Sequence, residues 1–453
     1  MKNLPQLTLL CALLFATFAC EKKTIDPTPA DETFTVTETN GLTSVEGSTA
    51  EDFTFRANKK YLLKGFVYVM PGATLTIEPG TIIKGDKDSK GTLIIERGAR
   101  IMANGTEQNP IVFTSNQPKG SRAAGDWGGV IILGAAPTNL PSENAQIEGG
   151  VFRYFGGTNA DDNSGTFKYV RIEFSGIAFQ PDNEINGLTL GGVGRGTTID
   201  HVQVSHCGDD AFEFFGGNVN AKYLIAYKTV DDMFDSDNGY SGKLQFLLGI
   251  SDPNVADASG SNGFESDGDA NNTDATPKTS AVFSNVSLFG PMATSSTTFN
   301  NNFKRGMHIR RNSNISVHNS LIAGWPVGLL LDGTKTQANA AGNTLKIQNT
   351  VISGSPAGRA LTVEAGSTYD VAAWFNTHGK GNMVVQNNSD LGITTSFSQN
   401  ARPTFSINGQ LQSGASFTGM DAFFTQTPYI GAFGNGTDWT ATWANFDPQN
   451  TDY

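Results

Sequence analysis

Acidic residues recur at a fixed spacing in the middle of this chain. Residues 209–213 read DDAFE, and residues 231–235, offset by 22 positions, read DDMFD. A third copy, GFESD at residues 263–267, follows after a longer insertion. Clustered carboxylates can bind a divalent cation or act as an acid–base pair, whereas Asp in a turn often bonds only to its own backbone. The choice depends on whether the fold places the copies side by side.

The wider sequence repeats at similar intervals. Residues 74–80 (TLTIEPG) recur as residues 92–98 (TLIIERG). Runs of β-branched and aromatic residues bounded by Gly, Asn, Asp or Ser predict strands at 169–174, 199–204, 223–227, 282–288, 315–322 and 345–352. No amphipathic helical stretch separates these runs, which argues against a βαβ fold, and 22 residues are too few for a propeller blade. The sequence therefore predicts an all-β, single-domain right-handed parallel β-helix over residues 53–430.

Strand alternation assigns the repeat to two faces. The shared aromatic slot, occupied by Phe212, Phe234 and Phe264, is expected to point inward, so its neighbours point outward. The outward positions are Glu213, Asp235 and Glu265, and two residues further along they are Phe215, Asp237 and Asp267. Parallel stacking would place successive acids about 4.8 Å apart. Two unit charges at that distance repel by roughly 1 kcal/mol in water and by about 3–4 kcal/mol at an effective dielectric constant of 20.

Such repulsion calls for a bound cation, raised carboxylate pKa values or neighbouring bases. Residues 267–271 (DGDAN) add alternating oxygen ligands of the kind that calcium takes. They do not form an EF-hand, because Asn272 stands where that loop needs glycine and Lys278 where it needs its closing acid. The predicted calcium ligands are Asp235, Asp237, Glu265, Asp267 and Asp269. The alternative is that these acids only shape the turns of the coils.

Two ends of the predicted helix resemble a known group of proteins. Residues 69–81 (VMPGATLTIEPGT) are similar to the entry coils of the pectate-lyase-like β-helix superfamily. Together with residues 429–433 (YIGAF) and 438–440 (DWT), they resemble a family of β-helix lipoproteins of Gram-negative bacteria. The resemblance covers roughly residues 60–445. It implies the fold, but that family has no settled activity.

Basic residues follow the acids along the predicted row. His308 and Arg310 come next and then Leu330 and Asp332, while Lys243 follows the second acidic coil. Acidic-glycan lyases on this fold neutralise a uronate with calcium or Arg and remove a proton with Arg or Lys, whereas hydrolases use a carboxylate pair. The candidate catalytic residues are Asp235, Glu265, His308 and Arg310. The candidate glycan-binding residues are Glu213, Asp237, Lys243, Arg310 and Trp325.

The N-terminus predicts export. Residues 1–19 have a basic start and a short apolar stretch, as in a signal peptide, and Cys20 follows in a context that resembles a lipobox. An ordinary signal peptide cleaved nearby is the alternative. Residues 20–52 are polar and predict a flexible tether. We therefore expect a lipid anchor at the outer membrane, on the cell surface or the periplasmic face. Residues 431–453, with Trp439 and Trp443, are expected to cap the last coil.

Composition narrows the function further. The chain has 453 residues, 52 of them glycine, and a net charge of −12, which argues against sequence-independent binding of nucleic acid. Cys11 lies in the signal and Cys20 takes the lipid, so Cys207 has no disulfide partner. We expect a protein that binds or helps to process polysaccharide at the cell envelope, with calcium as its candidate cofactor. The alternatives are a lyase or hydrolase and a structural or adhesive surface rod; oligomeric state stays open.

Overall fold

The computed structural model describes residues 33–141, 145–180, 183–377, 380–392, 409–434, 436 and 438–453. The chain divides into two units, Met1–Asp31 and Glu32–Tyr453, and all of these residues belong to the second. The expected signal peptide and Cys20 lie outside the described residues.

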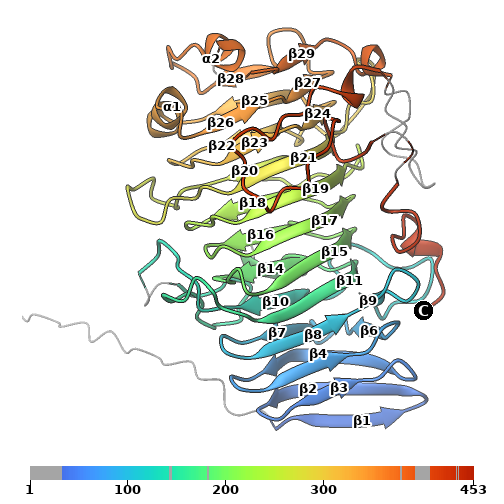
Figure 1. Ribbon diagram of the computed structural model, residues 1–453. Helices are drawn as coiled ribbons and strands as arrows, with labels where there is room; N and C mark the ends of the chain where they lie inside the picture. The colour runs from blue at the N-terminus through green and yellow to red at the C-terminus, as the bar shows by residue number, and fades with distance from the viewer. Residues whose placement is uncertain are drawn as a thin grey trace, which may run out of the picture. The chain divides into compact units, whose positions relative to one another are not determined.

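The second unit consists of coils in which strands of one turn hydrogen-bond to strands of the next (Figure 1). One sheet contains 27 of the strands, and its pairs are parallel except for β1 with β2. A separate antiparallel pair joins β12 (Ala178–Gln180) to β13 (Asn183–Glu184). This arrangement confirms the predicted right-handed parallel β-helix.

The strands of the large sheet stack in three ladders. Ladder 1 contains β7 (Thr92–Ile95), β10 (Val130–Leu133), β14 (Leu188–Gly191), β16 (Phe212–Phe215), β18 (Phe234–Asp237), β20 (Asn262–Ser266), β22 (Arg305–Ile309), β25 (Val327–Leu331) and β28 (Leu361–Val363). Ladder 2 contains β6 (Ile82–Gly85), β9 (Ile111–Ser115), β24 (Leu321–Ala323), β27 (Val351–Ser353) and β29 (Met383–Val385). Ladder 3 contains β3 (Phe53–Phe55), β5 (Thr74–Ile77), β8 (Arg100–Asn104), β23 (Ser316–His318) and β26 (Lys346–Gln348).

Longer strands bend from one ladder into the next. These strands are β2 (Leu42–Thr49), β4 (Lys60–Val69), β11 (Gly165–Glu173), β15 (Thr198–Ser205), β17 (Asn220–Tyr227), β19 (Lys243–Ile250) and β21 (Val282–Phe289). In β15 the bend falls at His201, whose φ of 52° breaks the extended conformation. The equivalent residues of neighbouring coils also have positive φ: Tyr169, Tyr223, Phe246, Asn285, Asn319 and Asn349. We call these seven residues the corner row.

The core runs between the ladders as one continuous column. In ladder 1, Phe212 pairs with Phe234 and Phe234 with Phe264, and all three are at most 1% exposed. Their ring centroids lie 5.3 and 5.8 Å apart. Aromatic contacts of this kind stabilise a core beyond the area that they bury. The predicted inward slot is therefore confirmed, and it forces the following residue of each strand outward.

The first coil begins earlier than predicted. β1 (Thr35–Thr39) pairs antiparallel with β2, and β2 pairs in parallel with β4. Residues 35–49 of the predicted tether are thus part of the β-helix, because their alternating Val, Leu and Thr residues extend the sheet. β1 also covers the edge of the first coil, which would otherwise leave backbone groups unpaired.

The predicted cap at the other end is wrong. The last strand of the helix, β29, ends at Val385, not near residue 430. Residues 409–434, 436 and 438–453, here called the C-terminal segment, run back along the corner row toward the first coils (Figure 1). Trp443 contacts the Tyr169 and His201 rings edge-on at 5.9 and 5.5 Å. The predicted packing of Trp439 and Trp443 over the last coil is therefore replaced by packing on the flank.

Short helices close the last coils instead. α1 (Thr334–Ala341) follows β25, and α2 (Val371–Thr377) buries Trp374 and Phe375 against the core. Three 3₁₀ turns, η1 (Asn388–Leu391), η2 (Gly409–Gln412) and η3 (Pro448–Asn450), complete the elements. In the described part of the chain, no helix has the length and apolar character needed to cross a membrane.

Candidate functional site

Ladder 1 brings the acidic repeat into one outward row. Glu213 pairs with Asp235 across β16 and β18, and Asp235 pairs with Glu265 across β18 and β20. β22 continues the row with His308 beside Glu265, and β25 places Leu330 beside His308. The residue spacing had predicted this order, and the register confirms it.

The Asp pairs in the turns before β16 and β18 join this row. In the described residues, three groups of acids each have ligand oxygens within 4.8 Å of one another: Asp210, Glu213 and Asp235; Asp232, Asp235 and Glu265; and Asp209, Asp210 and Asp231. We call these seven residues the carboxylate cluster. Asp235 belongs to two of the groups, so it lies where the turns and the strands meet.

Part of the cluster is fixed by the backbone of the next coil. Asp210 accepts a 2.8 Å hydrogen bond from the backbone N–H of Asp232, and Asp232 accepts one from the backbone N–H of Asn262. The second Asp of each pair therefore ties one coil to the next, as the turn-shaping alternative expects. Side chains add to this, since the Asn186 amide donates to Glu213 and also, at 3.2 Å, to Glu148.

The electrostatics of the cluster disfavour full ionisation. Burial, followed by repulsion from neighbouring acids, raises the pKa of Asp210, Glu213, Asp232 and Asp235 well above the ordinary range. The same causes, with Asp257 as the strongest neighbour, raise the pKa of Asp231 to about 7. Without a cation these carboxyl groups would hold protons near neutral pH, or repel one another.

One end of the row is already neutralised. Glu265 accepts a 3.1 Å hydrogen bond from Nδ1 of His308 and pairs with Arg310, and Asn262 donates to it at 3.0 Å. Although burial acts in the opposite direction, His308 and Arg310 lower the pKa of Glu265 below its usual range. Asp235, by contrast, has a buried Oδ1 with no hydrogen-bond partner among the described residues. The uncompensated charge is thus centred on Asp235.

Three of the predicted calcium ligands are placed elsewhere. Asp267 is occupied by Arg310 and Arg311, both at 2.6 Å. Asp269 accepts a 3.0 Å bond from the backbone N–H of Thr273 and a 2.7 Å bond from its hydroxyl, which shapes the loop. Asp237 accepts from the backbone N–H of Asn238 and belongs to none of the three groups. Only Asp235 and Glu265 of the predicted set lie in the carboxylate cluster.

The structure also changes two predicted glycan contacts. Lys243 begins β19 in ladder 3 and forms a 2.7 Å ion pair with Asp421 of the C-terminal segment. Trp325 is 1% exposed and donates its indole N–H to the carbonyl of Leu288, so it packs in the core and cannot stack on a sugar. Lys243 was assigned from its position after the second acidic coil and Trp325 from its aromatic side chain, and neither basis reveals the ladder or the burial of a side chain.

The basic catalytic candidates, His308 and Arg310, both pair with acidic side chains. His308 is 3% exposed and both of its ring nitrogens contact carboxylates, Glu265 at 3.1 Å and Asp332 at 3.0 Å. Arg310 bridges Glu265 and Asp267. In this arrangement the two side chains hold carboxylates in place, which suits positioning better than proton abstraction from a substrate.

The sequence analysis found the Asp pairs in the repeat but did not include them among the candidate ligands, and it missed their amide partners. The signal was present, because Asp209-Asp210 and Asp231-Asp232 repeat at the same offset as the strand residues. Asn186 and Asn262 carried no comparable signal, since single Asn residues are common in turns.

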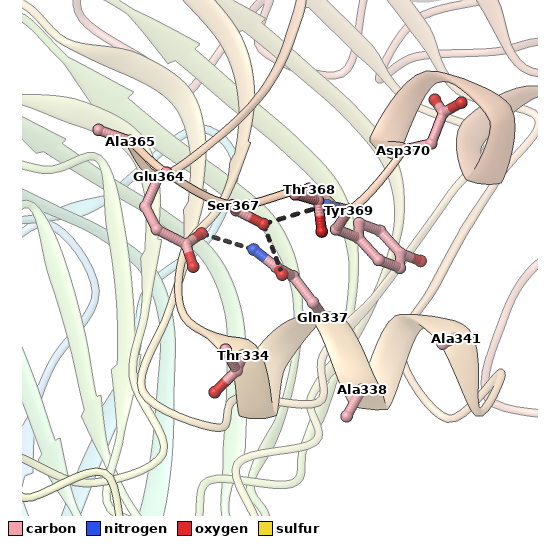
Figure 2. A pocket seen from close by; sticks show the side chains of 11 residues that line it. Thr334, Gln337, Ala338, Ala341, Glu364, Ala365, Ser367, Thr368, Tyr369 and Asp370 are labelled. Atoms are coloured by element: carbon pink, nitrogen blue, oxygen red, sulfur yellow. Dashed lines mark hydrogen bonds between the residues drawn. The ribbon is translucent and has the colours of Figure 1, made fainter.

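A large cavity of about 790 Å³ lies apart from the cluster, between α1 and residues 364–370. Figure 2 shows the Gln337 side chain between Glu364 and Ser367. Gln337 donates to Glu364 and accepts a 2.9 Å bond from the Ser367 hydroxyl. These polar groups bond to one another, and Glu364 and Asp370 are the two charged residues of the described lining.

The match to a family model agrees with the fold. The model of a family described as a pectate-lyase-like β-helix domain matches residues 47–401. The solved structure of pectate lyase Pel9A is similar at 14% identity and a TM-score of 0.34, covering 81% of this chain and 88% of that chain. The Dettilon tailspike protein (gp208) is similar at 10% identity and a TM-score of 0.27, covering 67% of this chain and 62% of that chain. No curated protein sequence matches the chain.

Proposed function

Because the chain belongs to the pectate-lyase-like β-helix domain family, we propose that it binds polysaccharide at the cell envelope through a calcium ion held by the carboxylate cluster. The observation that carries this proposal is the position of Asp235. It shares two groups of close ligand oxygens with acids of three successive coils, and its buried Oδ1 has no hydrogen-bond partner among the described residues.

The donor set fits a hard cation. Carboxylate oxygens at short mutual distances are the ligands that calcium takes, and softer metals would prefer nitrogen or sulfur. Asp210, Glu213 and Asp235 would hold the ion, with Asp232 and Glu265 behind them. When bound, calcium would supply positive charge and open coordination positions for hydroxyl or carboxylate oxygens of a glycan. Asn186 and Asn262 would keep the carboxylates oriented through their amide hydrogen bonds.

Binding is favoured over catalysis because the basic candidates are occupied. His308 and Arg310, the two basic catalytic candidates, both contact acids. A lyase or hydrolase is the second candidate, since the carboxylate oxygens of Asp235 and Glu265 lie close enough to work as a pair. New double bonds would raise the ultraviolet absorbance of uronate polymers in a lyase reaction, and new reducing ends would reveal a hydrolase. A structural or adhesive surface role predicts neither activity nor glycan binding.

For the location, we propose export and attachment to the outer membrane by lipid at Cys20. Support comes from the signal-like residues 1–19 and the small residue before the cysteine. Metabolic labelling with a fatty acid tests this: the wild type should incorporate label, and Cys20→Ser should not. Label in the variant would contradict the anchor.

Affinity electrophoresis on a glycan panel, with calcium and with chelator, tests the binding function. Calcium-dependent retardation by at least one glycan supports the proposed binding function, and Asp235→Asn should abolish this retardation. Asp161→Asn is a suitable control, because Asp161 is an exposed acid paired with Arg195. No retardation on a panel of acidic and neutral polysaccharides would count against the proposal and favour the structural role.

A further inference from the structure

A second cavity, of about 420 Å³, opens beside the carboxylate cluster. It is lined by the loop before β22, by Pro326 before β25 and by Arg359 before β28. Arg305 of β22 faces it and pairs in register with Asn262, which donates to Glu265 of the cluster. The cavity therefore continues ladder 1 beyond the acids, at the same edge of the strands.

The charge of this cavity is opposite to that of the cluster. Its lining includes Lys304, Arg305 and Arg359, and no described lining residue is an acid. Lys304 bonds to the carbonyl of Asn301 at 2.9 Å and Arg359 to that of Pro326 at 3.3 Å. The side chain of Arg305 has no ion pair or hydrogen bond to any described residue. Three cations that face one cavity without a carboxylate repel one another unless an anion joins them.

The burial of Arg305 makes this arrangement costly. Burial lowers the pKa of its guanidinium, and the fields of Glu265 and Asp332 oppose that effect only in part. Both acids contact His308, and neither forms an ion pair with the guanidinium of Arg305. A guanidinium presents a planar fork of donors that matches two oxygens of one carboxylate or sulfate.

The remaining walls are apolar. Phe299 is partly exposed in this wall, and Phe303 and Met292, which are 3% and 5% exposed, pack behind it with Val327. A small inorganic ion would leave these apolar side chains in contact with water, whereas a sugar ring with an apolar face would exclude water from them. The volume lies in the range of about 300–1,000 Å³ that small-ligand pockets occupy.

We propose that this cavity binds a sugar ring that carries a carboxylate or sulfate group, with Arg305 on the oxyanion and the partly exposed ring of Phe299 against the sugar. This inference names the ligand class of the proposed polysaccharide function and in that respect rests on it. It does not require calcium, because no residue of the carboxylate cluster lines the cavity. The two proposals can therefore fail separately.

Titration calorimetry of the full chain in chelator tests the inference, with glucuronic acid, glucose 6-sulfate, glucose and inorganic sulfate as probes. At least one acidic sugar should bind, and glucose should not. Arg305→Ala should weaken binding at least about tenfold, since hydrogen bonds to charged groups are the strong ones. Arg359→Ala, at an exposed side chain, should weaken it without a risk to folding. Arg195→Ala, which removes a surface cation paired with Asp161, should leave it unchanged.

Four results would overturn the inference: no binding of either acidic sugar, equal binding of glucose and the acidic sugars, unchanged affinity in both cavity variants, or equal affinity for inorganic sulfate and the sugar sulfate. An acidic sugar that binds in chelator, together with no calcium effect on the wild type, would leave this cavity standing while the calcium proposal falls. If no acidic sugar binds but calcium does, the calcium proposal would stand and the cavity proposal would fall.

Discussion

Asp235 and Glu265 are direct neighbours in register on β18 and β20, yet the pKa values of their carboxyl groups are shifted in opposite directions. Glu265 is compensated by His308 and Arg310, and its pKa is lowered by them despite its burial. The pKa of Asp235 is raised by burial first and then by repulsion from Glu265 and Asp267. Along this one row, Glu265 is paired with basic side chains, whereas no basic side chain of the described residues forms an ion pair with Asp235.

Asp235→Asn should remove the response to calcium. In the wild type, calcium at 100 times its dissociation constant should add about 2.7 kcal/mol to the free energy of unfolding. The variant should show little or no gain, because it lacks the carboxylate shared by two groups. Thermal melting with and without calcium measures this gain in the wild type and in the variant. A full calcium response in the variant would place the ion elsewhere.

The pH dependence of stability without calcium should be inverted relative to an ordinary acidic protein. The pKa of Asp231 and that of Asp237 are raised to about 7, mainly by burial, so the folded state binds more protons than the unfolded state between about pH 4 and 7. The stabilisation from these protons is present below pH 4 and is lost as the pH rises through 7.

Denaturant unfolding in chelator at pH 5.5 and 8 checks this inversion. The free energy of unfolding should be lower at pH 8, and calcium should recover it. Greater stability at pH 8 in chelator would mean that these acids are compensated by groups other than a metal.

The corner row should hold the C-terminal segment. Asn285 donates to the Thr427 hydroxyl at 3.1 Å and to the Tyr429 carbonyl at 3.0 Å. Asn285→Ala should loosen this segment and raise its rate of amide exchange or proteolysis. Asn349→Ala is the matched control, since both residues have positive φ, 55° and 50°, and would suffer similar backbone strain. Equal protection of the segment in the two variants would show that these bonds do not retain it.

The aromatic column should dominate the stability of the middle coils. Phe234 lies between the rings of Phe212 and Phe264 and is 1% exposed. Phe234→Ala should cost about 3–5 kcal/mol in the free energy of unfolding, as large cavities in a core do. Phe152→Ala, at a side chain that is 49% exposed, should cost far less. Similar losses in denaturant unfolding would contradict this difference.

The fold and the outward row of acids were predictable because residues that lie one repeat apart in the sequence of a solenoid are neighbours on adjacent coils. An offset of 22 residues between Glu213 and Asp235 is one coil, and the strand period then fixes which side chains point outward. The same logic explains why Phe212 and Phe234 were correctly placed inside.

Features that depend on loops and on distant segments were not predictable. Asp267 lies two residues beyond Glu265, but its partner Arg311 comes from the turn of the next coil. The path of the C-terminal segment is set by contacts such as that of Thr425 with Gln245, 180 residues away. Trp325 offered no sign of burial, because its neighbours Gly324 and Pro326 indicate an exposed turn as readily as a packed one.

The position of the cation tests the central claim most directly. Crystals soaked with a lanthanide that replaces calcium would show the ion by its anomalous scattering. We predict a peak coordinated by the carboxylates of Asp235, Asp210 and Glu213 that is absent from Asp235→Asn crystals. A peak held instead by Asp267 and Asp269, or no ordered peak at the carboxylate cluster in saturated crystals, would contradict the account.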